Sequence, residues 1–139
     1  MLPASARAVL DTNVWLDWLV FDDAGIGPLR AAHAHGALAL VAAPATRAEL
    51  AQVLARPAFG LDALGVAWRL AEHDRAVRLH DTPLAPCALR CTDPDDQVFL
   101  DLALAVRATL LVTKDRALLR LAPRARRDMG LRIVRPRDL

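Results

Sequence analysis

Short apolar runs alternate with amphipathic stretches along this chain. We interpret the runs, each three to six residues long, as buried strands: residues 8–10, 38–43, 77–79, 110–113 and 131–134. In the stretches between them, apolar side chains recur every three or four residues, which predicts helices. These cover residues 12–20, 29–35, 44–57, 61–74, 95–107 and 115–121. Three prolines predict a loop over 81–94, and we expect an arginine-rich turn after residue 121.

This alternation of strands and helices predicts an α/β fold. We expect three layers, with helices on both faces of a central, mainly parallel sheet. The 139 residues are the size of one domain, and no repeat or long linker divides them, so we expect a single domain over residues 1–139. The hydrophobic share of 55% beside 24% charged residues favours a folded protein over a disordered one.

No segment is predicted to cross a membrane. The longest apolar stretches, such as residues 37–45, are far shorter than the roughly 20 residues that span a bilayer. The N-terminus has one arginine and no long apolar region, which does not match a signal peptide. We therefore expect a cytoplasmic protein.

Side chains other than the acidic ones give little sign of chemistry. Cys87 and Cys91 lie four residues apart without companion ligands, so we expect reduced thiols. The four histidines form no ligand pattern, and we expect solvent-facing or incidental positions for them. The three tryptophans have a helical spacing that favours the core or a dimer interface over stacking on bases.

The formal net charge of +2 hides an asymmetry. Residues 1–113 carry 9 basic and 13 acidic side chains, whereas residues 114–139 carry 9 basic and 3 acidic ones. The C-terminal segment is either a solvated surface or a positive rim beside an acidic centre, as an enzyme that cuts a polyanion needs. On such a rim Arg116 and Arg120 are the expected nucleic-acid contacts, because a guanidinium binds phosphate in bidentate fashion.

Acidic residues collect where predicted strands end and predicted helices begin. Asp11 ends the first strand, Asp115 follows the fourth, and Glu49 lies in the first turn of the helix after the second. The segment 93–96 supplies three more aspartates at the start of another helix. Because the carboxyl ends of parallel strands share one edge of a sheet, we expect four separate segments to aim carboxylates at one crevice.

Carboxylates crowded in this way raise one another's pKa and destabilise a fold unless a cation compensates them. Oxygen ligands without histidine or cysteine favour Mg²⁺ or Mn²⁺, and one or two such ions suit phosphodiester hydrolysis. Each acid also has a purely structural interpretation. Asp11 and Asp115 would cap helices, the acids of 93–96 would only interact with a helix dipole, and Glu49 would close a capping box with Thr46.

Four segments, in this order, resemble the motifs of the PIN-domain family. Residues 9–14 (VLDTNV) resemble its first strand, and Glu49 matches its second acid. Residues 93–105 (DPDDQVFLDLALA) resemble the third motif and register the third acid at Asp96, while residues 111–115 (LVTKD) match the last. The DPDD form, together with residues 54–59 (LARPAF), is most similar to the branch that contains toxins of bacterial toxin–antitoxin pairs.

This resemblance implies a PIN-like fold and an endoribonuclease that uses Mg²⁺ or Mn²⁺. The implied metal-site acids are Asp11, Glu49, Asp96 and Asp115. Asn13 and Thr113 would support them by orienting a water or a carboxylate. Asp101, five residues after Asp96 and therefore about 140° round the helix, would face the same metal only loosely.

The resemblance also implies partners: an RNA substrate, a cognate antitoxin and a second copy of the chain in a homodimer. Two alternatives stay open. A PIN-like protein without catalysis would bind RNA or a partner, and loss of a metal-site acid would mark it. A phosphatase of the haloacid dehalogenase type also has Asp-x-Asn after its first strand, but its acidic pair follows the Thr and Lys, whereas Asp95-Asp96 precede Thr113-Lys114 here.

Overall fold

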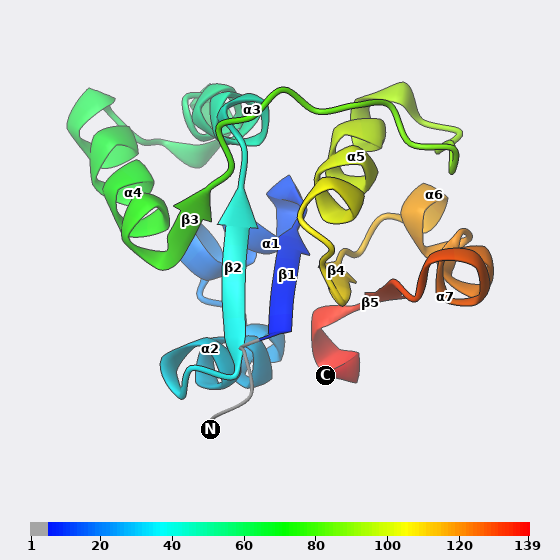
Figure 1. The fold of residues 1–139 in the computed structure, drawn as a ribbon. Coiled ribbons are helices and arrows are strands. Elements are labelled where there is room, and N and C mark those ends of the chain that lie inside the picture. The colour runs from blue at the N-terminus through cyan, green and yellow to red at the C-terminus, as the bar shows by residue number, and fades with distance from the viewer. Residues whose placement is uncertain (1–5) are drawn as a thin grey trace.

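Five parallel strands form the central sheet of the structure, a computed structural model that describes residues 6–139 (Figure 1). They are β1 (Ala6–Leu10), β2 (Leu38–Ala42), β3 (Val77–Leu79), β4 (Leu110–Val112) and β5 (Arg132–Val134). Their order across the sheet is β3-β2-β1-β4-β5. The predicted α/β class and the predicted strands are confirmed.

Helices cover both faces of this sheet, which makes the predicted three layers (Figure 1). One face carries α1 (Thr12–Leu16), α2 (Gly27–Ala34), α3 (Pro44–Leu54) and α4 (Ala63–Ala76). The other carries α5 (Gln97–Ala105), α6 (Arg116–Leu119) and α7 (Ala122–Met129). A π-helical turn, η1 (Asp17–Phe21), extends α1, and short 3-10 turns lie at η2 (Ala24–Ile26), η3 (Pro57–Phe59), η4 (Pro94–Asp96) and η5 (Pro136–Asp138).

Two apolar cores lie between the sheet and its helices. Because successive side chains of a strand point to opposite faces, Leu10 joins one core while Val9 joins the other. In the same way Val112 of β4 packs with α1 and α3, and Leu111 packs with α5 and α6. The strands are therefore buried on both sides, which explains why they appear in the sequence as continuous apolar runs.

The connections of the sheet place one crevice beside β1. The chain runs from β1 outward to β2 and β3, and then returns to the opposite side of β1 for β4 and β5. Such a reversal leaves a crevice at the carboxyl ends of the two central strands, where ligands bind in open parallel sheets. Leu10 pairs with Val112 here, so the next residues, Asp11 and Thr113, become neighbours at that crevice.

The turn predicted after residue 121 is wrong, because this segment forms helix α7. Arginine and alanine favour helices, Pro123 is compatible with the first turn, and Gly130 ends the helix with a φ of +67°. Ala125 is completely buried against the second core, so packing on the sheet also stabilises this helix.

The tryptophans and histidines, predicted from the sequence to be core or interface residues and solvent-facing or incidental residues respectively, lie in different environments. Trp15 is buried in the core as predicted, and it packs edge-on against His73 with ring centroids 4.6 Å apart. His73 is 1% exposed, so it is not solvent-facing at this position. Trp68, by contrast, is 70% exposed on α4.

Within residues 6–139, no helix is long and apolar enough to cross a membrane.

Candidate metal centre

The carboxylate of Asp11 lies at the end of β1, against the end of β4. Its Oδ1 accepts a hydrogen bond from the Val14 amide at 3.1 Å and so caps α1. Its Oδ2 accepts a hydrogen bond from the hydroxyl of Thr113, a side chain that is completely buried. The helix-capping interpretation of Asp11 is therefore correct for one oxygen, while the other connects β1 to β4.

Asp115 follows β4 and begins α6. Its Oδ1 accepts a hydrogen bond from the Ala117 amide at 2.7 Å, as helix capping requires. Its own amide donates to Thr113 Oγ1 at 2.9 Å. Thr113 thus contacts both Asp11 and Asp115, and these are the contacts that a supporting residue of the site would make.

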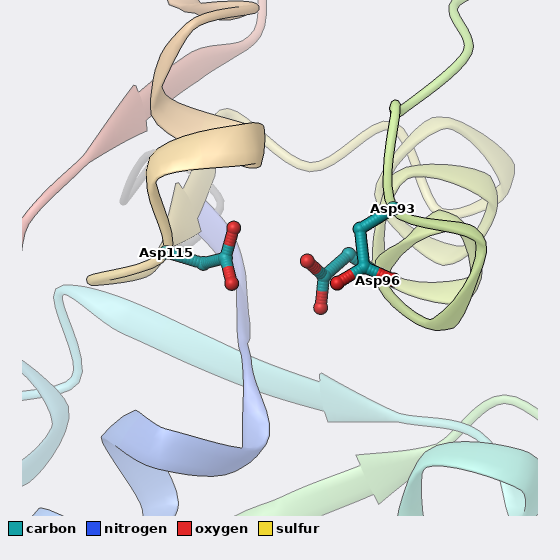
Figure 2. Close-up of side chains that lie close together, drawn as sticks. All are labelled: Asp93, Asp96 and Asp115. Atoms are coloured by element: carbon teal, nitrogen blue, oxygen red, sulfur yellow. The ribbon is translucent and has the colours of Figure 1, made fainter.

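Asp93 and Asp96, at the start of α5, point across the crevice towards Asp115 (Figure 2). One carboxylate oxygen from each of the three lies within 4.8 Å of the other two. Asp93 also accepts a hydrogen bond from the Asp95 amide at 3.0 Å, which caps η4. Asp96 Oδ2 is buried, and no group of residues 6–139 forms a hydrogen bond with it. The sequence motifs single out Asp96, and only the structure places Asp93 beside it.

Glu49 accepts a hydrogen bond from the hydroxyl of Thr12 on α1. The alternative in which Glu49 closes a capping box with Thr46 is wrong. The Thr46 hydroxyl itself accepts a hydrogen bond from the Ala43 amide and donates one to the Ala43 carbonyl, both at 3.0 Å. Helix α3 begins earlier than that box requires because Pro44 fits its first turn. Glu49 consequently lies a turn further into the helix.

A pocket of about 250 Å³ contains three of the four predicted acids. Its lining residues are Asp11, Thr12, Asn13, Leu16, Glu49, Val53, Arg56, Phe59, Asp96 and Phe99. Asp96 belongs both to this pocket and to the cluster with Asp93 and Asp115. The four acids from separate segments of the chain therefore surround one crevice, and the predicted Asn13 lines it too.

The crowding of negative charge appears in the acid–base properties of the site. Burial, followed by the negative charges of Asp115 and Asp93, raises the pKa of Asp96 from its ordinary value of 3.8 to about 7. Burial also raises the pKa of Asp11, against the opposing effect of its hydrogen bonds from Thr113 and Val14. In the metal-free protein, ionising these carboxylates is therefore unfavourable, and a nearby cation would reverse that cost.

The donor set fits a hard divalent cation. Oxygen ligands on one octahedral Mg²⁺ lie roughly 3 to 4 Å apart, as follows from Mg–O distances of about 2.1 Å. The oxygens of Asp93, Asp96 and Asp115, at most 4.8 Å from one another, would need only a small approach. Asp96 Oδ2 has a free lone pair with which to bind such a cation. Mg²⁺ and Mn²⁺ are the ions that all-oxygen sites of this kind select.

Asp101 is not at the metal cluster and instead binds a loop. Its Oδ1 accepts hydrogen bonds from the Cys87 amide at 3.1 Å and from Gln97 Nε2 at 3.0 Å. Gln97 in turn accepts from the Cys91 amide at 2.7 Å and donates to the Leu89 carbonyl at 3.0 Å. The two cysteines are free thiols in this loop, as predicted. Asp101 and Gln97 therefore fasten residues 87–91 to α5, just before Asp93.

The two arginines predicted to contact nucleic acid lie on, or at the end of, the helix that follows Asp115. Arg116 and Arg120 are exposed on α6 and at its end, and neither is among the residues that line the carboxylate pocket. A larger pocket, of about 310 Å³, lies between Lys114, Asp17 and the segment 135–137, where Lys114 forms an ion pair with Asp17 at 2.6 Å. That pocket contains none of the predicted metal-site acids.

Together, the fold and the site define an α/β protein with clustered carboxylates at the switch point of a parallel sheet. Residues 7–117 match the family model of the PIN domain, and the chain belongs to that family. This membership leaves no support for the phosphatase alternative. No curated protein matches the chain at a significant level.

The chain is also similar in fold to a solved structure, that of VapBC2 from Rickettsia felis bound to a DNA fragment from its promoter. The TM-score is 0.62 with 15% sequence identity, over 91% of this chain and 96% of that chain. At this identity the similarity concerns the fold, and it agrees with the PIN-like architecture predicted from the motifs.

Proposed function

We propose that this PIN-domain protein is a metal-dependent endoribonuclease that consists of a single domain. The observation that carries the proposal is the cluster of Asp93, Asp96 and Asp115, whose oxygens approach within 4.8 Å of one another while Asp96 Oδ2 lacks a hydrogen-bond partner among residues 6–139. A bound Mg²⁺ or Mn²⁺ lowers the pKa of water and neutralises charge on a phosphate, which is the chemistry that phosphodiester hydrolysis needs.

The side chains of this chain would divide the work. Asp11, Glu49, Asp96 and Asp115 hold one or two ions, and Asp93 joins them beside Asp96. Thr113 keeps the Asp11 carboxylate in place, and Thr12 does the same for Glu49. Asn13, in the lining of the same pocket, orients water or substrate. No covalent enzyme intermediate would be required: a water held among these groups would attack the phosphorus and give up a proton, while the bond from phosphorus to one ribose oxygen breaks and that oxygen takes up a proton.

We further propose that the protein is the toxin of a type II toxin–antitoxin pair and works in the cytoplasm. Its motifs resemble the toxin branch of the family, and the similarity in fold to VapBC2 supports the same assignment. An antitoxin and a second copy of the chain are the proposed protein partners. Phe21, Leu64 and Trp68 are large apolar side chains exposed on the face that carries α1 and α4, and they would suit such contacts.

Cleavage of total RNA tests the enzymatic proposal. We expect the wild-type protein to cut RNA with Mn²⁺ and to leave it intact with EDTA, and we expect Asp96→Asn to abolish cutting. Asp95→Asn is the matched control, since Asp95 is an exposed neighbour outside both the cluster and the pocket. If the wild-type protein binds Mn²⁺ and RNA but cuts nothing, the alternative of a PIN-like binding protein without catalysis replaces this proposal.

A further inference from the structure

Arg56 is a cation in the lining of the carboxylate pocket, which it shares with Asp11, Glu49 and Asp96. In the sequence it belongs to residues 54–59 (LARPAF), but nothing there indicated that it lies at the site. The residues that would hold metal are all acidic, so this guanidinium is chemically different from the rest of the pocket's polar groups. A positively charged guanidinium does not bind a metal ion, so we infer that Arg56 has another role in this pocket.

Arg56 lies just after α3, which ends at Leu54. Glu49 and Val53, one helical turn apart on α3, line the pocket from the helix, and Arg56 lines it from the segment that follows. Pro57 then holds Arg56 in an extended conformation, with φ of −65° and ψ of 138°. Arg56 thus lines the pocket from two residues beyond the end of α3.

The guanidinium of Arg56 has no protein partner within residues 6–139: no hydrogen bond or ion pair there involves it. Arg47, on α3 itself, behaves differently, because it forms a bidentate pair with Asp74, with both N–O distances at 2.9 Å. Arg56 remains unpaired although it shares a pocket with carboxylates. Its donors are therefore available to an external anion.

An RNA strand presents such an anion. A pocket lined by carboxylates repels a phosphodiester, and a guanidinium at its wall offsets part of that repulsion while offering two parallel N–H donors to phosphate oxygens. We propose that Arg56 binds a backbone phosphate of the RNA that enters the pocket, and so is a substrate-binding residue of this site. This inference rests on the proposed function for the identity of the anion.

The test measures binding separately from cleavage. Fluorescence anisotropy with a short labelled single-stranded RNA, with Ca²⁺ in place of Mn²⁺ and the RNA checked for integrity afterwards, gives the affinity at several salt concentrations. Arg56→Ala should weaken binding about tenfold to a hundredfold, as loss of a charge-assisted hydrogen-bonded pair does. It should also reduce the slope of log K against log salt by about 0.7, the value for one phosphate contact on a single strand.

Two further variants make the result specific. Arg56→Lys keeps the charge but not the fork of donors, so it should keep the salt slope and recover only part of the affinity. Arg75→Ala removes an exposed arginine at the end of α4, outside the pocket, and should bind like the wild type. Circular dichroism checks that Arg56→Ala is folded, as expected for an exposed side chain.

The possible results separate this inference from the proposed function. Equal affinities for Arg56→Ala and Arg75→Ala, or no RNA binding by the wild type, would overturn the role of Arg56. Binding that depends on Arg56 in a protein that never cuts RNA with Mn²⁺ would support the phosphate contact while contradicting the nuclease.

Discussion

The hydroxyl of Thr113 donates a hydrogen bond to Asp11 Oδ2 across the junction of β1 and β4. Thr113 has no exposed surface, and Asp11 is 3% exposed, so water cannot replace this contact. The pairing of Leu10 with Val112 in the sheet brings the two residues together. A register between two strands thereby fixes the orientation of a carboxylate at the crevice.

Replacing Thr113 with valine should weaken both stability and metal binding. The variant leaves the Asp11 carboxylate without its hydroxyl donor and the Asp115 amide without its acceptor, a loss of about 1 to 3 kcal/mol. We expect Mn²⁺ affinity, measured by calorimetry, to fall about tenfold to a hundredfold, as for other residues that orient metal ligands. Thr113→Ser should restore most of it. Thr109→Val, at the exposed opposite end of β4, is the control; an equal loss there would contradict the account.

Thr46 and Glu49 should have separate effects, since the hydroxyl of Thr46 caps α3 and Glu49 faces the pocket. Thr46→Val should lower the free energy of unfolding by about 1 kcal/mol, as other cap losses do. Glu49→Gln should leave stability without metal nearly unchanged and should strongly reduce RNA cleavage. Urea unfolding and a cleavage assay on both variants distinguish these effects. If Glu49→Gln destabilised the protein and Thr46→Val did not, the capping box between Thr46 and Glu49 would be supported instead.

The stability of the metal-free protein should depend on pH through Asp96. Its pKa is about 7 when folded, against an ordinary 3.8, so the folded state keeps a proton that the unfolded state releases. The contribution of Asp96 to stability is therefore highest below about pH 4, falls as pH rises to about 7, and stays level above that. Because Asp96 is partly exposed, we expect a loss of about 1 to 2 kcal/mol.

Asp96→Asn removes this titration, so the variant should gain stability relative to the wild type as pH rises, with EDTA present. Urea unfolding at about pH 5 and about pH 8 measures the difference, and Asp95→Asn again serves as the control. Parallel pH profiles for the wild type and Asp96→Asn would show that the carboxylates are not crowded in the way that the structure indicates.

Asp101→Ala should loosen a loop without removing a metal ligand. The substitution breaks hydrogen bonds to the Cys87 amide and to Gln97. We expect faster hydrogen exchange at the amides of residues 87–91 and a stability loss of about 1 kcal/mol. The affinity for Mn²⁺ should change by about threefold or less, because no metal ligand is removed. A loss of Mn²⁺ binding as large as that of Asp96→Asn would instead make Asp101 a ligand.

Much of the fold could be predicted because its strands are buried on both faces and stand out as short apolar runs. Helix α7 was missed because residues 122–129 (APRARRDM) are rich in charged residues and have few large apolar side chains, and only the burial of Ala125 and the stop at Gly130 mark them as helical. The buried position of His73 was equally hidden, since it depends on the neighbouring ring of Trp15.

The site shows the same division between local pattern and tertiary contact. The gathering of Asp11, Glu49, Asp96 and Asp115 at one crevice was predictable because the carboxyl ends of parallel strands share one edge of the sheet, although Glu49 lies a turn further into α3 than the sequence indicated. The place of Asp93 in the cluster depends on how η4 turns into α5, which the spacing of residues alone does not determine. Arg56 had one usable signal, its place in residues 54–59 (LARPAF), which resemble the toxin branch of the family.

The most direct test of the central claim is an anomalous difference map from crystals grown with MnCl₂. We predict a manganese peak coordinated by Asp96 and Asp115, within reach of Asp93 and Asp11, and no such peak in Asp96→Asn crystals. Manganese bound only elsewhere on the protein, or no peak at all at saturating MnCl₂, would contradict the assignment of this crevice as a metal centre.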